Sequence, residues 1–148
     1  MEKLVPVIDE FCSFPAIEKA DFFKRVLFCY VTGNEDMHLK NFSLITKNGK
    51  TTLTPIYDFL NSSIVIKNPE EEIALTLKGK KSNLKATDFI DYYAKGRLQL
   101  NEKTVVTILE QMENAIPKWK ELLEISFLSD EMKEKYLELL KYKLNLFL

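Results

Sequence analysis

The longest regular pattern of apolar positions lies between residues 17 and 31. Apolar side chains recur there every three to five positions, as expected for a helix that buries one broad face. On this interpretation Glu18, Lys19 and Lys24 lie on the opposite, wet face. The side chains predicted to pack inward are Ile17, Phe22, Phe23, Val26, Leu27 and Tyr30.

Residues with special backbone preferences mark both ends of this helix. Ser13 can accept hydrogen bonds from free N–H groups, and Pro15 is tolerated in a first helical turn, so the helix should begin near them. Gly33 should end it, because glycine readily adopts the left-handed conformation that follows many helices.

After residue 41 the pattern changes to short runs of β-favouring residues. The runs at 42–46 and 51–54 flank the dipeptide Asn48-Gly49, which is the strongest short-range signal for a β-hairpin. Pro55 should end the second strand, because proline cannot donate to a strand ladder.

The second half of the chain shows mainly helical periodicity. Residues 61–84 are expected to be loop-like, with a short strand or helix around 73–77. Thr87 should cap a short helix through Tyr93, and Asn101 should cap a longer helix that Pro117 breaks or kinks. A further segment is expected at 119–123, and the last helix should follow Ser129-Asp130. The whole pattern predicts a mainly α fold with one hairpin.

Composition limits the class of protein. The 148 residues, 46% of them hydrophobic and 29% charged, predict one globular domain over 1–148. With 21 basic and 22 acidic residues, the net charge of −1 gives no general attraction to nucleic acid or to an anionic membrane. Cys12 and Cys29 stand in apolar surroundings, which favours free thiols and a reducing compartment. The sequence shows no leader-like or membrane-spanning run. From these two observations we expect a cytoplasmic protein.

The segment GNEDMHLKN at residues 33–41 carries candidate chemistry. Asp36 and Asn41 form a D-x-x-x-x-N arrangement, and the hairpin can bring Asp58 back beside Asn41. Protein kinases use such a set: one Asp accepts the proton of the attacking hydroxyl, while an Asn and a second Asp bind Mg²⁺. Carboxylate and amide oxygens are suitable ligands for Mg²⁺.

The stretch GNEDMHLKNFSL followed by LTPIYDF resembles the catalytic half of HipA-type serine/threonine kinases, the toxins of bacterial toxin–antitoxin pairs. The later stretch IALTLKGKKSNLKATDF is similar to the same family. The resemblance implies a helical carboxy-terminal lobe of a protein-kinase-like fold, with the hairpin next to the catalytic and metal loops. It also implies Asp36 as catalytic base, Asn41 and Asp58 as Mg²⁺ ligands, and ATP as phosphoryl donor. The matching positions are Gly33, Asn34, Asp36, His38, Lys40, Asn41, Pro55, Tyr57 and Asp58.

Two further residues of the motif have open roles. Lys40 or His38 would neutralise charge on the transferred phosphate, or each would be purely structural. Because His38 is the only histidine of the chain, a zinc site is not expected. Tyr57 and Phe59 are expected to pack around Asp58, and the basic run Lys78, Lys80 and Lys81 to be a solvated loop.

The chain also departs from a complete kinase. Its glycines are too far apart for a glycine-rich phosphate loop, so an ATP-binding amino-terminal lobe cannot be recognised in it. The first hypothesis is therefore the catalytic-lobe portion of an ATP- and Mg²⁺-dependent protein kinase that phosphorylates a protein hydroxyl. The alternative is a non-catalytic module that binds an antitoxin or a separate amino-terminal lobe, with neither nucleic acid nor membrane as a direct partner. A metal-dependent phosphohydrolase is a weaker third candidate.

Overall fold

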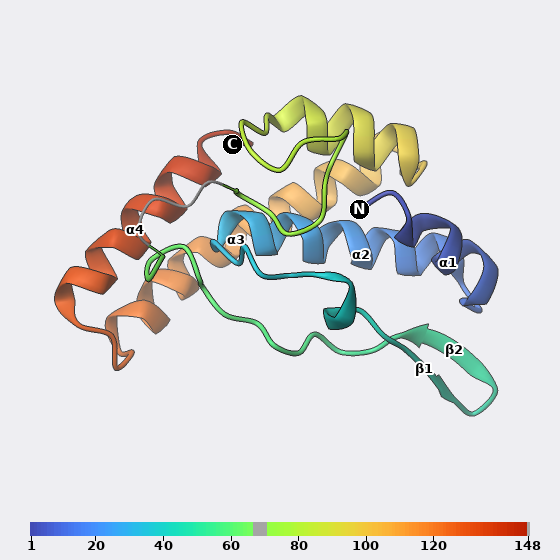
Figure 1. The fold of residues 1–148 in the computed structure, drawn as a ribbon, viewed down its shortest axis with the longest axis horizontal. Helices are drawn as coiled ribbons and strands as arrows, with labels where there is room; N and C mark the ends of the chain where they lie inside the picture. Colours follow the sequence, from blue (N-terminus) through green and yellow to red (C-terminus); the bar gives the residue numbers. More distant parts are fainter. Residues whose placement is uncertain (67–70, 148) are drawn as a thin grey trace.

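The computed structural model describes residues 1–66 and 71–147, and these form a mainly helical structure with one two-stranded sheet (Figure 1). The predicted mainly α fold with one hairpin is confirmed. No helix within the described ranges is both long and apolar enough to cross a membrane. The elements in chain order are α1 (Leu4–Phe11), α2 (Pro15–Val31), the 3-10 turn η1 (Leu39–Asn41), β1 (Leu44–Lys47), β2 (Lys50–Leu53), the π-helix η2 (Asp88–Arg97), α3 (Glu102–Glu124) and α4 (Asp130–Leu144).

Helix α2 runs through the middle of the structure and contacts α1, α3, α4 and β2 (Figure 1). Pro15 stands in its first turn, as predicted. Five of the six side chains predicted to pack inward are fully buried, but Ile17 is 65% exposed. Ile17 lies in the first turn of the helix, at the rim of an open pocket.

The hairpin forms at the predicted dipeptide. Residues 44–47 pair antiparallel with residues 50–53, and Asn48 and Gly49 both have positive φ, of 51° and 72°. Positive φ at both central residues is the requirement of the two-residue turn that matches strand twist. The first strand begins two residues later than predicted: Phe42 already has extended backbone but is the C-cap of η1, and the pairing with β2 starts at Leu44.

Polar side chains attach β2 to α2. Glu18 accepts the Leu53 N–H at 2.8 Å, and Arg25 donates to the Thr54 carbonyl at 2.5 Å. The prediction that Glu18 lies in water is wrong: it is buried, because the outer side of β2 needs an acceptor for its N–H. Ser13 likewise accepts the Thr51 N–H at 2.9 Å instead of capping α2.

The second half contains the predicted helices with different bounds. The helix expected through Tyr93 continues to Arg97 as a π-helix, whose last turn is closed by a Leu98 N–H bond to the Tyr93 carbonyl. Phe89 of this helix is buried, and so are Tyr93 and Ala94, four and five positions later, and the C-cap Leu98, which suits the wider π turn.

Pro117 was predicted to break or kink α3, and the break does not occur. The helix begins at the predicted Asn101 cap, whose side chain accepts the Thr104 N–H at 2.8 Å, and continues through the exposed Pro117. The lost hydrogen bond is outweighed by packing beyond it, where the Trp119 ring lies 5.1 Å from the Phe28 ring of α2.

The basic run is not a freely solvated loop. Lys78 and Lys80 each lie 3.6 Å from a carboxylate oxygen of the buried Asp88. Burial alone would raise the pKa of Asp88. The hydrogen bond from the Lys85 N–H and the two ammonium groups outweigh burial, so the pKa is lowered overall. The run therefore helps to fix the start of η2. The short element expected at 73–77 is limited to a single bridge between Leu77 and Lys80.

A buried charged cluster connects α4, α2 and the segment after residue 71. Lys143 Nζ lies 2.7 Å from Glu72 Oε1 and 3.9 Å from the centre of the Tyr30 ring. The Tyr30 hydroxyl donates to the same carboxylate, and the Leu84 N–H donates to its other oxygen at 2.9 Å. Burial and the nearby Glu72 charge raise the pKa of Tyr30, which keeps its hydroxyl a donor.

We expect Lys143→Met to lower the free energy of unfolding by about 2 kcal/mol, because it leaves the Glu72 carboxylate without its cation inside the structure. The matched control is Lys135→Met, which removes an exposed pair with Glu131 on the same helix and should cost no more than about 0.5 kcal/mol. Urea unfolding of the two variants measures the difference. Equal losses would contradict a stabilising role for the buried cluster.

Candidate active site

The site begins where α2 ends. The Gly33 N–H donates to the Tyr30 carbonyl at 3.3 Å, and the Asn34 N–H donates to the Cys29 carbonyl at 2.9 Å. These two bonds, with Gly33 at φ +74°, make the Schellman arrangement that closes a helix. Gly33 therefore ends the helix as predicted and sets the direction of the loop that follows.

The loop is held by short-range hydrogen bonds. The Asp36 N–H donates to the side-chain oxygen of Asn34 at 3.2 Å, and the His38 N–H donates to the Asp36 carbonyl at 2.8 Å. The Asn41 N–H then donates to the His38 carbonyl at 3.0 Å within η1. A continuous series of bonds thus runs from Asn34 to Asn41.

Asn41 and Asp58 are in direct contact, as the hairpin prediction required. The Asn41 amide donates to Asp58 Oδ2 at 2.8 Å. Asn41 is only 6% exposed, and its Oδ1 has no hydrogen-bond partner among the described residues. Asp58 is exposed and has φ of 54°, an uncommon conformation that Asp tolerates better than most residues. The pair therefore offers two oxygen ligands, one of them buried and unused.

The residues on either side of Asp58 anchor it. The Tyr57 hydroxyl donates to the Lys40 carbonyl at 2.7 Å, so the loop of Asp58 is tied to the loop of Asn41 a second time. The Phe59 ring stacks on Phe28 of α2, with centroids 4.8 Å apart and planes at 14°. The expectation that these two aromatic residues fix the metal loop agrees with both contacts.

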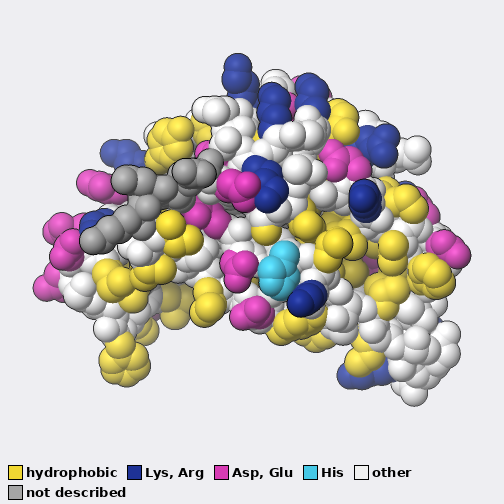
Figure 2. All heavy atoms as spheres, viewed as in Figure 1, with side chains coloured by type: hydrophobic (Ala, Val, Ile, Leu, Met, Phe, Trp, Pro, Cys, Tyr) yellow, Lys and Arg dark blue, Asp and Glu magenta, His cyan; other side chains and the backbone are white. Residues whose placement is uncertain are grey.

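The other candidate residues lie on the same loop. Asp36 and Lys40 are exposed, and His38 is half-buried, with an Nδ1 that has no partner in the described part of the chain. Figure 2 shows the histidine at the surface, with acidic and basic side chains beside it. The structure thus joins Asn41 to Asp58 by side chains, and it links Asp36 to Asn41 by backbone bonds through His38.

The segment at 61–63 makes contacts that the sequence analysis did not anticipate. The Ser62 and Ser63 N–H groups both donate to the Gly33 carbonyl, at 3.0 and 3.1 Å. The Ser62 hydroxyl also accepts the Glu35 N–H at 2.9 Å. A pair of serines in an irregular segment is a known source of side-chain to backbone bonds, but the sequence gives no indication of their partner.

The donor set at the pair fits a hard cation. No cluster of three or more His, Cys, Asp or Glu side chains that could hold a metal occurs within residues 1–66 and 71–147. Two protein oxygens suit Mg²⁺, which commonly keeps several waters and binds through one or two carboxylates plus phosphate oxygens of its substrate. The unpartnered Asn41 Oδ1 is consistent with this use.

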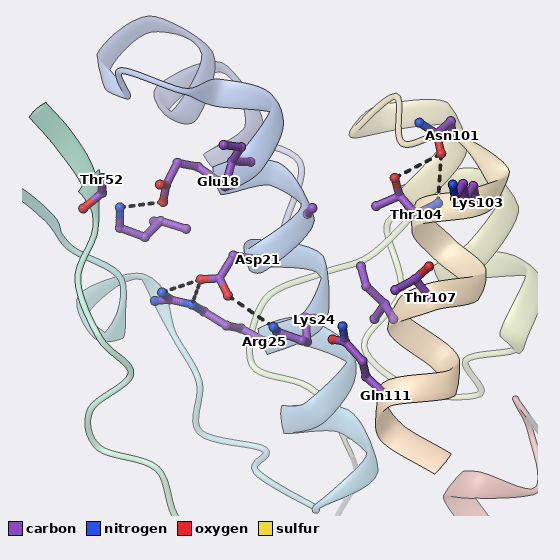
Figure 3. A pocket seen from close by; sticks show the side chains of 14 residues that line it. Glu18, Asp21, Lys24, Arg25, Thr52, Asn101, Lys103, Thr104, Thr107 and Gln111 are labelled. Carbon is purple, nitrogen blue, oxygen red and sulfur yellow. Dashed lines mark hydrogen bonds and ion pairs between the residues drawn. The ribbon is translucent and has the colours of Figure 1, made fainter. Parts of the chain in front are cut away.

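A separate pocket of about 660 Å³ lies between α2, α3 and β2 (Figure 3). None of the five candidate residues lines it. Three of its charged groups are already engaged: Arg25 is paired with Asp21 at 2.5 Å, and Glu18 accepts the Leu53 N–H. We therefore assign it no part in the chemistry.

Residues 1–120 match the family model described as the HipA-like C-terminal domain. The chain belongs to this family. Two curated proteins are similar to it. "Putative kinase" of Haemophilus influenzae is 45% identical over 47 residues, covering 31% of this chain and 14% of that protein. "Putative kinase Y4dM" of Sinorhizobium fredii is 33% identical over 103 residues, covering 68% of this chain and 25% of that protein.

The HipA-like fold is also found in a solved structure. The chain matches the Shewanella oneidensis HipA structure, determined in a complex of HipA, HipB and operator DNA, with a TM-score of 0.71 and 20% identity. The match covers 97% of this chain and 34% of that one. The HipA-like domain described here therefore spans a quarter or less of the curated relatives and about a third of the solved chain.

We expect Gly33→Ala to lower the free energy of unfolding by about 3 kcal/mol, the sum of left-handed strain and overpacking. A Cβ at Gly33 would lie 2.5 Å from Leu139 Cδ2 and 2.9 Å from Ser63 Oγ. Gly49→Ala is the control: its φ of +72° is nearly the same, but no described atom lies within 4 Å of the new Cβ, so only about 1 kcal/mol should be lost. Equal effects in urea unfolding would show that crowding at Gly33 is unimportant.

Proposed function

We propose that this chain is the catalytic-lobe portion of a HipA-like, ATP- and Mg²⁺-dependent serine/threonine protein kinase. The observation that carries the proposal is the Asn41–Asp58 contact, with a buried and unused Asn41 oxygen beside the exposed Asp58 carboxylate. Two relatives that bear the name of kinase and a HipA-like fold support it.

Each residue has a defined role in this proposal. Asp36, exposed on the loop, accepts the proton of a substrate hydroxyl as the hydroxyl oxygen bonds to the γ-phosphorus of ATP and the bond to ADP breaks. Asn41 and Asp58 would hold Mg²⁺, which supplies positive charge to the phosphate oxygens when bound. Lys40 and His38 are the candidates for further charge neutralisation on the same loop.

The geometry also explains how the two loops act together. The proton acceptor and the metal ligands must keep a fixed separation, because phosphoryl transfer depends mainly on positioning and charge stabilisation. The side-chain contact of Asn41 with Asp58, and the Tyr57 bond to the Lys40 carbonyl, hold the two metal-ligand segments together, and backbone bonds through His38 link Asn41 to Asp36.

A second candidate function is binding without chemistry, to an antitoxin or to a separately encoded amino-terminal lobe. Apolar side chains beside the site favour a protein partner: Leu39 is 52% exposed, Ile56 40% and Leu60 66%. Large apolar groups exposed together are typical of interaction surfaces. The HipA structure similar to this chain is itself a complex with HipB and DNA.

The metal assignment predicts weak binding of Mg²⁺ or Mn²⁺ by the chain. Two protein ligands leave most of the coordination to water, so calorimetry should detect only weak affinity, and Asp58→Asn should abolish it. Asp91→Asn is the control, because Asp91 is an exposed acid on η2 outside the site. Unchanged affinity in Asp58→Asn would show that Asp58 is not a ligand.

The kinase assignment predicts that the chain alone transfers phosphate near background rate, and that adding an ATP-binding lobe of its family restores transfer. Asp36→Asn keeps the side-chain shape but removes the base, so the restored rate should fall by a factor of about 10² to 10⁴. The measurement is transfer of labelled phosphate from radiolabelled ATP. The three samples are the chain alone, the chain plus the added lobe, and the Asp36→Asn chain plus the added lobe.

Three results would count against parts of the assignment. Strong transfer by the chain alone would show that no further lobe is needed. Undiminished transfer by Asp36→Asn would remove Asp36 from the role of base. Stable binding of the added lobe with no transfer in any sample would favour the interaction module.

A further inference from the structure

In the proposed kinase, residues 33–41 are the catalytic loop and the segment around Asp58 is the metal loop. The residues that follow the metal loop return to the beginning of the catalytic loop. Asn61, Ser62 and Ser63 come three to five residues after Asp58. The Gly33 carbonyl accepts hydrogen bonds from both serine N–H groups, and the Ser63 hydroxyl oxygen lies 3.0 Å from the same carbonyl oxygen. One carbonyl at the end of α2 is thus surrounded by donors from a segment about thirty residues later.

Glu35 receives two further contacts from the same serines. Its N–H donates to the Ser62 hydroxyl at 2.9 Å, and the Ser63 hydroxyl bonds to its carboxylate oxygen Oε1. All three residues are half-buried. Backbone and side chain of Glu35 are therefore both held, and Glu35 immediately precedes Asp36.

These contacts connect the two segments at the near end of the motif, at Gly33 and Glu35. The Asn41–Asp58 contact and the Tyr57 bond to the Lys40 carbonyl connect them at its far end. Asp36 lies in the sequence between these two sets of contacts. A loop tied at both ends has few alternative backbone conformations, so the direction of the Asp36 carboxylate is limited by contacts that Asp36 itself does not make.

We propose that Glu35, Ser62 and Ser63 are positioning residues that orient Asp36 relative to the Asn41–Asp58 pair. The proposal rests on the proposed kinase function for its purpose, but the contacts themselves can be tested without catalysis. It gives the Ser-Ser segment a role that neither the family match nor the motif assigns.

The experiment compares Glu35→Ala, Ser63→Ala and Glu35→Gln in the 148-residue chain. Amide hydrogen exchange at Asp36 is measured by NMR, with Leu27 in the core of α2 as the internal reference. Loss of a hydrogen bond to a charged group should make exchange at Asp36 about tenfold faster or more in both alanine variants. Exchange at Leu27 should change much less.

Two variants act as controls. Glu35→Gln keeps an acceptor for the Ser63 hydroxyl, so exchange at Asp36 should stay close to that of the natural chain. Thr46→Ala removes an exposed hydroxyl pair with Thr51 in the hairpin and should leave Asp36 unchanged. If Glu35→Gln behaves like Glu35→Ala, or if Leu27 and Asp36 accelerate by the same factor, the contacts are merely structural and the proposal is overturned.

A second readout uses Mn²⁺ as a paramagnetic probe of position. In the natural chain, Mn²⁺ at the Asn41–Asp58 pair should broaden the Asp36 amide resonance. In the alanine variants this broadening should fall several-fold, while Mn²⁺ affinity stays the same. Unchanged broadening at Asp36 overturns the positioning role. If the natural chain binds no Mn²⁺, the metal part of the proposed function fails, and the exchange measurement still decides the positioning role.

Discussion

The end of α2 at Gly33 is the constraint on which the rest of the site depends. The two closing hydrogen bonds require a left-handed residue there, and a Cβ would crowd the side chains of Leu139 and Ser63. Helix α2 contacts α1, α3, α4 and β2, and Cys29, Tyr30 and Val31 of its last turn are buried, so this turn has a fixed position in the core. The loop from Asn34 to Asn41 therefore starts from a rigid point, and its short-range bonds carry that position forward.

The hairpin provides the return path, and its attachment to α2 matters as much as its turn. An isolated two-stranded hairpin is only marginally stable, so it could not place Asp58 by itself. Glu18 and Arg25 hold β2 and the residue after it against the same helix that ends at Gly33. Helix α2 thus positions both loops. The loop from Asn34 to Asn41 starts at its carboxyl end, and the loop of Asp58 is held against its side through β2. Stacking of Phe59 on Phe28 adds a third connection to that helix.

Local signals in the sequence predicted the parts of the structure that local forces determine. The Gly33 stop, the Asn48-Gly49 turn and the caps at Asn101 and Ser129 each depend on residues within a few positions. One miss is local, since Thr87 makes no side-chain cap bond to η2, and the larger misses involve distant partners. Glu18 is buried because a strand thirty-five residues later needs an acceptor, and α3 continues past Pro117 because packing against α2 outweighs one lost bond. Helix α1 was not predicted at all, since eight residues including Pro6 form a stable helix only when packed on α2.

The distribution of unsatisfied polar atoms separates the site from the rest of the core. Other buried polar side chains, such as Glu18 and Lys143, have their partners. Of the buried side-chain atoms without a partner among the described residues, those on the motif belong to Asn34, His38 and Asn41. An unpaired buried polar atom costs about 1 to 3 kcal/mol, so three of them on one loop set this loop apart from the rest of the core.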